Sequence, residues 1–250
     1  MGANGRLVSI ARRLIVNFRP RSAVDGLARL VWPPVCAICG RAADGADDWC
    51  RGCVAALPVA AGECRCCGVA LPRSVDRCGA CIERPPPFAR TEAAFAYRSP
   101  LPALVQRFKF NGDPVAGRVL AELMARRLAA RRADRPQLMV PVPLNWRREW
   151  RRGFNQAEWL CRDLHARLAM LPWAPVLVRR RATATQSELP APSRAGNVRR
   201  AFELRALPPG ARHVALVDDV MTTGATLREC ARVLRRAGVQ RVDLWVVARA

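Results

Sequence analysis

The sequence lacks several features that would assign it to common protein classes. None of its apolar runs approaches the roughly 20 residues that a membrane-spanning helix needs. The apolar stretch at 7–18 is interrupted by Arg12 and Arg13, so it lacks the continuous core of a secretory signal peptide. Histidine occurs only twice, lysine only once, and aromatic residues make up 6% of the chain. We therefore expect no membrane span and a cytoplasmic protein with reduced thiols.

Positive charge, by contrast, is in excess. Forty-two basic residues against 20 acidic ones give a net charge of +22, and residues 84–250 carry 31 of the basic and 13 of the acidic side chains. Arginine supplies 41 of the basic residues, which indicates a G+C-rich coding bias but does not explain the net charge. An excess of this size suits a polyanionic partner, either nucleic acid or a phosphorylated substrate.

Eleven cysteines include an internal repeat. The spacing C-x2-C-x10-C-x2-C occurs twice, 28 residues apart, with a glycine after the second cysteine of each copy. Four thiolates in two close pairs suit a tetrahedral Zn²⁺ ion, so each copy predicts a structural zinc ribbon, with an iron–sulfur cluster as the alternative. Cys66 breaks the repeat and is interpreted as a spare thiol. The predicted metal ligands are Cys36, Cys39, Cys50 and Cys53 in the first copy and Cys64, Cys67, Cys78 and Cys81 in the second.

Residues 214–226 read V-A-L-V-D-D-V-M-T-T-G-A-T. The apolar run at 214–217 is typical of a parallel strand covered on both faces, and apolar positions recur at helical spacing after Thr226. In open α/β sheets such strand-to-helix turns bind ligands, and backbone N–H groups with threonine hydroxyls can hold a phosphate there. Gly224 permits close approach of the ligand, while carboxylates accept hydrogen bonds from sugar hydroxyls, with help from a divalent cation.

Two further stretches are rich in side chains that bind phosphate. The first follows a strand predicted at 138–144; the second spans 176–202, which is long for a connection inside a compact domain and suggests a binding loop. Guanidinium groups bind phosphate bidentately, so a diphosphate or nucleic-acid site is predicted, with a basic surface lacking a ligand as the alternative. The candidates are Arg147, Arg148, Arg152, Asn155, Gln156, Arg179, Arg181, Thr183, Gln186, Arg194 and Asn197.

Aromatic residues needed for base stacking are few, but Trp146, Trp150 and Phe154 are interleaved with arginines in the first basic stretch. Strands are also predicted at 93–97 and 242–248, and a helix at 114–133. The proline-rich run at 84–88 indicates a stiff linker. The chain is therefore expected to form an α/β domain with a mainly parallel sheet, preceded by the small cysteine-rich region.

The motif at 214–226 resembles the loop of type I phosphoribosyltransferases that binds 5-phosphoribosyl-1-diphosphate (PRPP) with Mg²⁺. That resemblance implies that Asp218 and Asp219 hold the ribose hydroxyls as catalytic residues. It also implies that the loop holds the 5-phosphate; the loop comprises Val220, Met221, Thr222, Thr223, Gly224, Ala225 and Thr226.

Over residues 27–250 the chain resembles the ComF family, a double zinc ribbon followed by a phosphoribosyltransferase-like domain. The motifs are the cysteine repeat, F-K-F-x-G-D at 108–113, P-V-P-L at 141–144, R-R-x-x-x-R-G-F-N-Q at 147–156, R-x-R-x-T-x-x-Q-x-x-L at 179–189, R-x-x-N-V at 194–198 and the PRPP loop. The implied domains are a double zinc ribbon at 27–83, a linker at 84–90 and a phosphoribosyltransferase-like domain at 91–250. Residues 1–26 precede them as an extension whose structure stays open.

Members of the ComF family are implicated in natural competence, the uptake of DNA. The resemblance therefore implies one of two functions. The first is a phosphoribosyltransferase with an unknown acceptor. The second is a PRPP-binding accessory protein without turnover that binds single-stranded nucleic acid and other competence or DNA-processing proteins.

Overall fold

The computed structural model describes residues 34–44, 47–129, 135–180 and 200–250. The chain forms two compact units that divide after Val54. The smaller unit contains the first cysteine cluster, whose last member, Cys53, lies in helix α3 (Arg51–Ala55), and Val35 and Ala42 form a β-bridge within it. The larger unit contains the second cysteine cluster and the sheet. The domain limits drawn from the sequence stay a prediction.

A four-stranded parallel sheet organises the larger unit. Its order is β3 (Arg90–Ala96), β8 (Arg241–Arg249), β7 (His213–Met221) and β4 (Leu138–Pro141), and the register aligns Val140 with Leu216 and Leu216 with Leu244. The four strands predicted from the sequence all belong to this sheet. The predicted α/β class with parallel strands is thereby confirmed.

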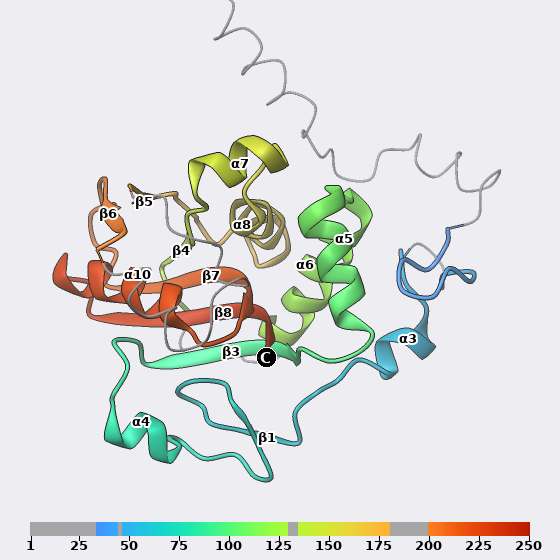
Figure 1. The fold of residues 1–250 in the computed structure, drawn as a ribbon, viewed down its shortest axis with the longest axis horizontal. Coiled ribbons are helices and arrows are strands. Elements are labelled where there is room, and N and C mark those ends of the chain that lie inside the picture. The colour runs from blue at the N-terminus through green and yellow to red at the C-terminus, as the bar shows by residue number, and fades with distance from the viewer. Residues whose placement is uncertain (1–33, 45–46, 130–134, 181–199) are drawn as a thin grey trace, which may run out of the picture. The chain divides into compact units, whose positions relative to one another are not determined.

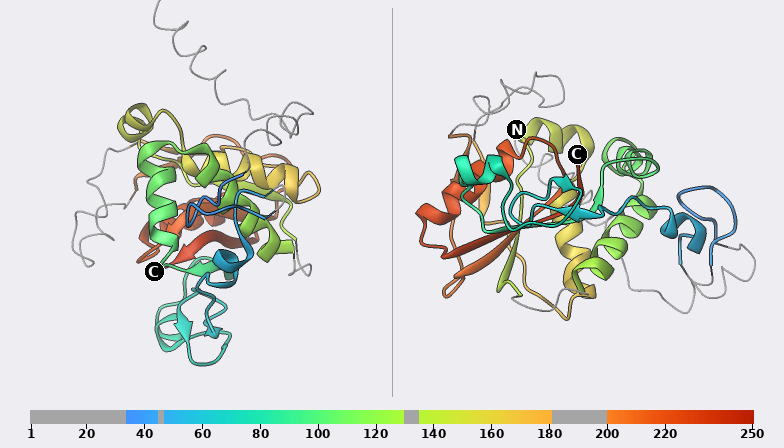
Figure 2. Two further views of the ribbon diagram at one scale, coloured as in Figure 1. Left: turned by 90° about the vertical axis from the view of Figure 1, so that its right-hand side faces the viewer. Right: turned by 90° about the horizontal axis from the view of Figure 1, so that it is seen from below.

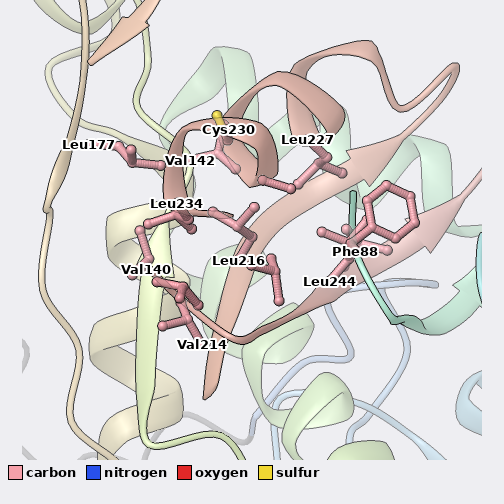
Figure 3. Packing of buried hydrophobic residues seen from close by; sticks show 14 of the residues in the cluster. Phe88, Val140, Val142, Leu177, Val214, Leu216, Leu227, Cys230, Leu234 and Leu244 are labelled. Carbon is pink, nitrogen blue, oxygen red and sulfur yellow. The ribbon is translucent and has the colours of Figure 1, made fainter. Parts of the chain in front are cut away.

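Helices cover both faces of the sheet (Figures 1 and 2). One face carries α5 (Leu101–Asn111), α6 (Pro114–Ala129) and α8 (Gln156–Arg167), and the other carries α10 (Ala225–Arg236). Successive side chains of each strand point to opposite faces of the sheet, so every strand contributes apolar residues to the core on both sides. On the α10 side, Leu216 and Leu244 pack against Leu227 and Leu234 (Figure 3).

The second cysteine cluster shares the core on the α10 side of the sheet. It is built from β1 (Gly62–Glu63), β2 (Ala70–Leu71) and α4 (Gly79–Glu83), and the buried Cys66 and Phe88 belong to the same apolar cluster as Leu244. Thr91 Oγ1 donates a 2.7 Å hydrogen bond to the Cys66 carbonyl. Phe88, the last residue of the predicted proline-rich linker, is thus an anchor in the core.

Arg249, the last residue of β8, joins this cluster to the turn after β7. Its Nε donates to the Cys67 carbonyl at 3.2 Å, and its Nη1 donates to the carbonyls of Met221 at 3.1 Å and Thr222 at 2.6 Å. One guanidinium group therefore binds the backbone of both segments.

Three elements differ from the sequence-based expectation. The basic stretch after β4 forms a helix, α7 (Trp146–Arg152), which begins where the Asn145 side chain accepts the Arg147 amide and ends at Gly153, whose φ is 83°. Helix α5 lies in a stretch for which no helix or strand was predicted. The ends of the predicted long loop at 176–202 pair as antiparallel strands β5 (Leu177–Arg179) and β6 (Phe202–Leu204).

Candidate functional site

The acidic pair lies near the carboxyl end of β7. Because Asp218 and Asp219 are adjacent on a strand, their side chains lie on opposite faces of the sheet. Asp219 is 5% exposed and lies on the α5 side, where its Oδ2 accepts a 2.8 Å ion pair from Lys109 Nζ. Asp218 lies on the α10 side, close enough for its charge to interact with Cys230. The pair thus meets a different element on each face.

A glycine turn follows the pair. Gly224 is the N-cap of α10 and has φ of 72°, a left-handed conformation that favours glycine. A Cβ there would come within 2.6 Å of Met221 Cε. Thr222 and Thr223 are exposed beside the start of a twelve-residue helix, whose first amides point outward. The turn therefore has the composition and the backbone geometry of an anion site.

Basic groups approach the same edge from other elements. Arg152 of α7 interacts electrostatically with Asp219, and Arg179 of β5 interacts with Asp218; burial lowers the pKa of both guanidinium groups. Arg152 Nη1 donates to Gln156 Oε1 at 3.0 Å. Within the described part of the chain, Arg152 Nε and Gln156 Nε2 are buried donors with no hydrogen-bond partner. Unpaired buried donors are costly, so they indicate a polar ligand at this position.

The other predicted residues of the basic stretches separate into three groups. Arg147 is exposed and stacks on Trp146, 5.1 Å from the ring centroid, while Arg148 interacts with Arg152 and Arg179. Asn155 is buried as the cap of α8, accepting the Ala157 amide at 3.0 Å. Arg181, Thr183, Gln186, Arg194 and Asn197 lie outside the described residues.

Phe154 also differs from expectation. Its ring packs against Phe108 at 5.4 Å and Trp159 at 5.9 Å, within an aromatic group that joins α5 to α8. Phe110, which the sequence analysis did not single out, is 66% exposed and lies under Arg152 at 5.0 Å. The exposed aromatic residues near the basic helix are therefore Trp146, Trp150 and Phe110.

The electrostatics of the acidic pair are unequal. Burial, followed by the negative charge of Asp219, raises the pKa of Asp218 to about 7. Burial disfavours the charge of Lys109, but the Asp219 carboxylate overcomes this effect and raises the pKa of the ammonium. Near neutral pH the three groups together carry at most one net negative charge.

Both cysteine clusters have the geometry of a metal site. In each, the four Sγ atoms lie within 4.8 Å of one another. Cys39 and Cys50 Sγ are 3.8 Å apart and Cys67 and Cys78 Sγ are 3.7 Å apart. These separations match the sulfur–sulfur distance of about 3.8 Å that a tetrahedral ion with Zn–S bonds of about 2.3 Å requires. Four thiolates therefore surround one zinc-sized space in each cluster.

The two clusters repeat the same backbone hydrogen bonds. The Cys50 amide donates to Cys36 Sγ at 3.4 Å, and the Cys78 amide donates to Cys64 Sγ at 3.2 Å. Gly40 and Gly68 both have positive φ, 75° and 69°. Hydrogen bonds from the backbone and side chain of Arg41 lower the pKa of the Cys39 thiol to about 6, which favours the thiolate that binds metal.

Comparison with known proteins agrees with this architecture. A model of the double zinc ribbon domain matches residues 27–82, and a model of the phosphoribosyl transferase domain matches residues 152–250. The DNA utilization protein YhgH of Salmonella typhimurium is 38% identical over 219 residues, covering 86% of this chain and 90% of the relative. Its namesake from Escherichia coli K12 is 41% identical over 174 residues, covering 68% and 76%. Competence protein F of Haemophilus influenzae is 39% identical over 178 residues, covering 68% and 77%.

The fold and the two cysteine clusters thus define a protein that combines a double zinc ribbon with a phosphoribosyltransferase domain. Together with these relatives, they show that the chain belongs to the ComF family. The match to a zinc ribbon also favours zinc over the iron–sulfur alternative. No helix among the described residues is long and apolar enough to cross a membrane.

Sequence reasoning missed two residues that approach the acidic pair or its neighbours. Lys109 and Phe110 lie on α5, more than 100 residues before the acidic pair. The sequence did hold a weak indication that Lys109 has a special role, because it is the only lysine in a chain with 41 arginines. For Phe110 the signal was its place in the F-K-F motif.

Metal content tests the two clusters separately. We expect close to two zinc ions per chain by mass spectrometry, and close to one in either Cys39→Ser or Cys78→Ser, because each cluster binds its own ion. Cys66→Ser is the matched control and should keep both. The Cys78→Ser variant should also melt at a lower temperature, since its cluster shares a core with the sheet. Zinc near zero in freshly purified, reduced wild type would contradict the assignment.

The raised pKa of Asp218 predicts how stability depends on pH. Between about pH 4 and pH 7 the Asp218 carboxyl retains a proton in the folded state that it releases in the unfolded state, so its contribution to stability falls as the pH rises. Asp218→Asn removes this dependence, and at pH 8 it should raise the free energy of unfolding by about 2–4 kcal/mol. Urea unfolding at pH 5 and pH 8 measures the difference.

Asp113→Asn is the control, because it should change the free energy of unfolding at pH 8 in the opposite direction. Burial opposes ionisation of Asp113, but the Ala116 amide and the Arg107 guanidinium together lower its pKa, so this variant should lose stability at pH 8. Equal effects of Asp218→Asn at the two pH values would show that the carboxyl group is not perturbed by folding.

Proposed function

We propose that the chain binds PRPP at the carboxyl end of β7 and acts as a phosphoribosyltransferase whose acceptor is unknown, in the cytoplasm and in a process linked to DNA uptake. The observation that carries the proposal is the juxtaposition of two carboxylates with a glycine turn at the start of α10. Carboxylates suit the ribose hydroxyls, and the amides and threonines of the turn suit the 5-phosphate. The names of the relatives support the link to DNA.

The 5-phosphate would lie at the glycine turn, and the diphosphate would lie away from that turn, among the basic groups that approach the acidic pair. Arg152 Nε and Gln156 Nε2 supply buried donors that lack partners among the described residues. Mg²⁺ bound with PRPP would supply further positive charge as the diphosphate leaves. Asp218 and Asp219 would fix the ribose while Arg152 neutralises the leaving group.

The proposed transfer replaces one bond at the anomeric carbon of the ribose with another. A nitrogen lone pair of the acceptor forms a bond to C1′ of the ribose, and the bond from C1′ to the diphosphate oxygen breaks. The electron pair leaves with the diphosphate, and the acceptor nitrogen releases its proton to solvent water. No side chain of the described site is required to form a covalent intermediate.

Calorimetry with PRPP and Mg²⁺ tests the binding step. We expect saturable binding by wild type and a loss of at least about 30-fold in affinity when Asp218→Asn is combined with Asp219→Asn, which corresponds to about 2 kcal/mol for the lost hydrogen bonds to the ribose. Gly224→Ala should weaken binding as well, because its backbone needs positive φ. Asp163→Asn, in the i,i+4 pair with Arg167 on α8, is the control. Absence of binding by folded wild type would overturn the proposal.

A second candidate function is supported by the exposed aromatic residues near α7. Trp146 and Trp150 are 60% and 79% exposed, four residues apart on one helix, and four arginines share that helix. Stacking platforms beside guanidinium groups are typical of sites for single-stranded nucleic acid. In this case PRPP binds without turnover, and the basic helix binds the strand.

Fluorescence anisotropy with a labelled single-stranded oligonucleotide tests this surface. Trp150→Ala should weaken binding by about 1–3 kcal/mol, because one base loses its stacking partner. Met170→Ala, another exposed apolar residue, is the control and should have no effect. Diphosphate release is then assayed with and without the oligonucleotide: release identifies an enzyme, whereas binding of both ligands without release favours the accessory protein.

A further inference from the structure

Lys109 is largely buried, which is unusual for a lysine. It belongs to the F-K-F sequence of α5, between Phe108, which is fully buried, and Phe110, which is exposed beneath Arg152. Its side chain is 23% exposed, and its ammonium ion is 2.8 Å from Asp219 Oδ2. The packing of Phe108 against Phe154 fixes the helix turn that directs Lys109 to the carboxyl end of β7.

The contact leaves Asp219 with a partner on each oxygen. Oδ1 accepts the Val220 amide at 2.6 Å, and Oδ2 accepts the ion pair from Lys109. Asp218 Oδ1 accepts a 2.9 Å hydrogen bond from the Asp219 amide, and this is the one hydrogen bond of its carboxylate within the described part of the chain. Asp219 is therefore held in one orientation by the amide on one oxygen and the ammonium ion on the other.

We propose that Lys109 is the built-in counter-cation of the acidic pair, a positioning residue that orients Asp219 and reduces the negative charge that a phosphorylated sugar meets there. This inference deepens the proposed function and rests on it for the identity of the ligand. The ammonium ion pairs with Asp219 and lies close enough to Arg152 for their charges to interact, so it belongs to the basic edge where the proposal puts the phosphate groups.

The chemistry of lysine explains why arginine does not occupy this position. An ammonium ion is a compact point charge on a flexible stem, whereas a guanidinium group is planar and presents a wide fork of donors. Because Asp219 Oδ1 already accepts the Val220 amide, only the buried Oδ2 is open to a side-chain cation, and one oxygen suits the compact donor. In a chain with 41 arginines, the one lysine stands at the position that requires this geometry.

Several neighbouring groups besides Lys109 interact with the acidic pair. Asp218 interacts with Arg179 of β5 and Cys230 of α10, and Arg152 of α7 acts on Asp219; Arg148 acts on both arginines. Lys109 itself lowers the pKa of Asp218, opposing burial and Asp219, which raise it. Removal of the ammonium ion should thus move the titration of Asp218 upward while the other groups stay in place.

The first measurement needs no ligand. Carboxyl-labelled aspartate is titrated by NMR in the full chain, with Asp218→Asn used to assign the signal. We expect Lys109→Met to raise the pKa of Asp218 by about half a unit or more, through loss of a nearby positive charge, and Lys109→Arg to leave it close to wild type. Arg107→Met is the control, because Arg107 is on the same helix but pairs with Asp113 outside the site.

The second measurement is calorimetry with PRPP and Mg²⁺. Lys109→Met should bind at least about 30-fold more weakly than wild type, and Lys109→Arg about 3- to 10-fold more weakly, because charge is restored without the compact geometry. Arg107→Met should bind within twofold of wild type even if it melts at a lower temperature. This contrast separates a positioning role from a general loss of stability.

The outcomes distinguish the two proposals. If wild type does not bind PRPP while Lys109→Met still raises the pKa of Asp218, the proposed function fails and the counter-cation assignment stands. If Lys109→Met is folded, titrates like wild type and binds PRPP within twofold of it, the assignment of Lys109 is wrong although the proposed function survives.

Discussion

The candidate site depends on the alternation of side chains at the end of one parallel strand. The two adjacent acids of β7 point to opposite faces of the sheet, although their charges still interact and Asp219 helps to raise the pKa of Asp218. Asp219 then meets a lysine from α5, while Asp218 stays on the side of α10 with a pKa near neutrality. This arrangement makes it possible for a pair of carboxylates to lie beside a turn suited to phosphate.

Much of this architecture could be predicted from local patterns. The strands of the sheet are short apolar runs, the turn has a distinctive order of acids, threonines and glycine, and the cysteine spacing repeats. Each of these patterns spans at most a few tens of residues, so it can be recognised in the sequence without knowledge of the fold. Helix α5 also carried a signal, because Leu101, Leu104, Val105 and Phe108 follow helical spacing and are all buried.

The features that could not be predicted depend on contacts between distant parts of the chain, which no local sequence pattern contains. Helix α7 buries none of its residues, so its sequence shows no apolar period; its cap at Asn145 and the left-handed Gly153 define it instead. Phe154 reads as an exposed aromatic among arginines but packs between two helices. The pairing of Lys109 with Asp219 joins positions 110 residues apart, and only the folded chain brings them together.

Arg249 has a consequence for where the chain can be shortened. Its guanidinium group binds the Cys67 carbonyl as well as the carbonyls of Met221 and Thr222, and Phe88 lies in the core beside the second cysteine cluster. A fragment beginning after that cluster would remove the Cys67 carbonyl that helps to hold the Arg249 side chain, and it would expose an apolar surface. The smallest fragment that retains the turn as described here must therefore begin before Cys64, so that the second ribbon is kept as a structural part of the transferase fold.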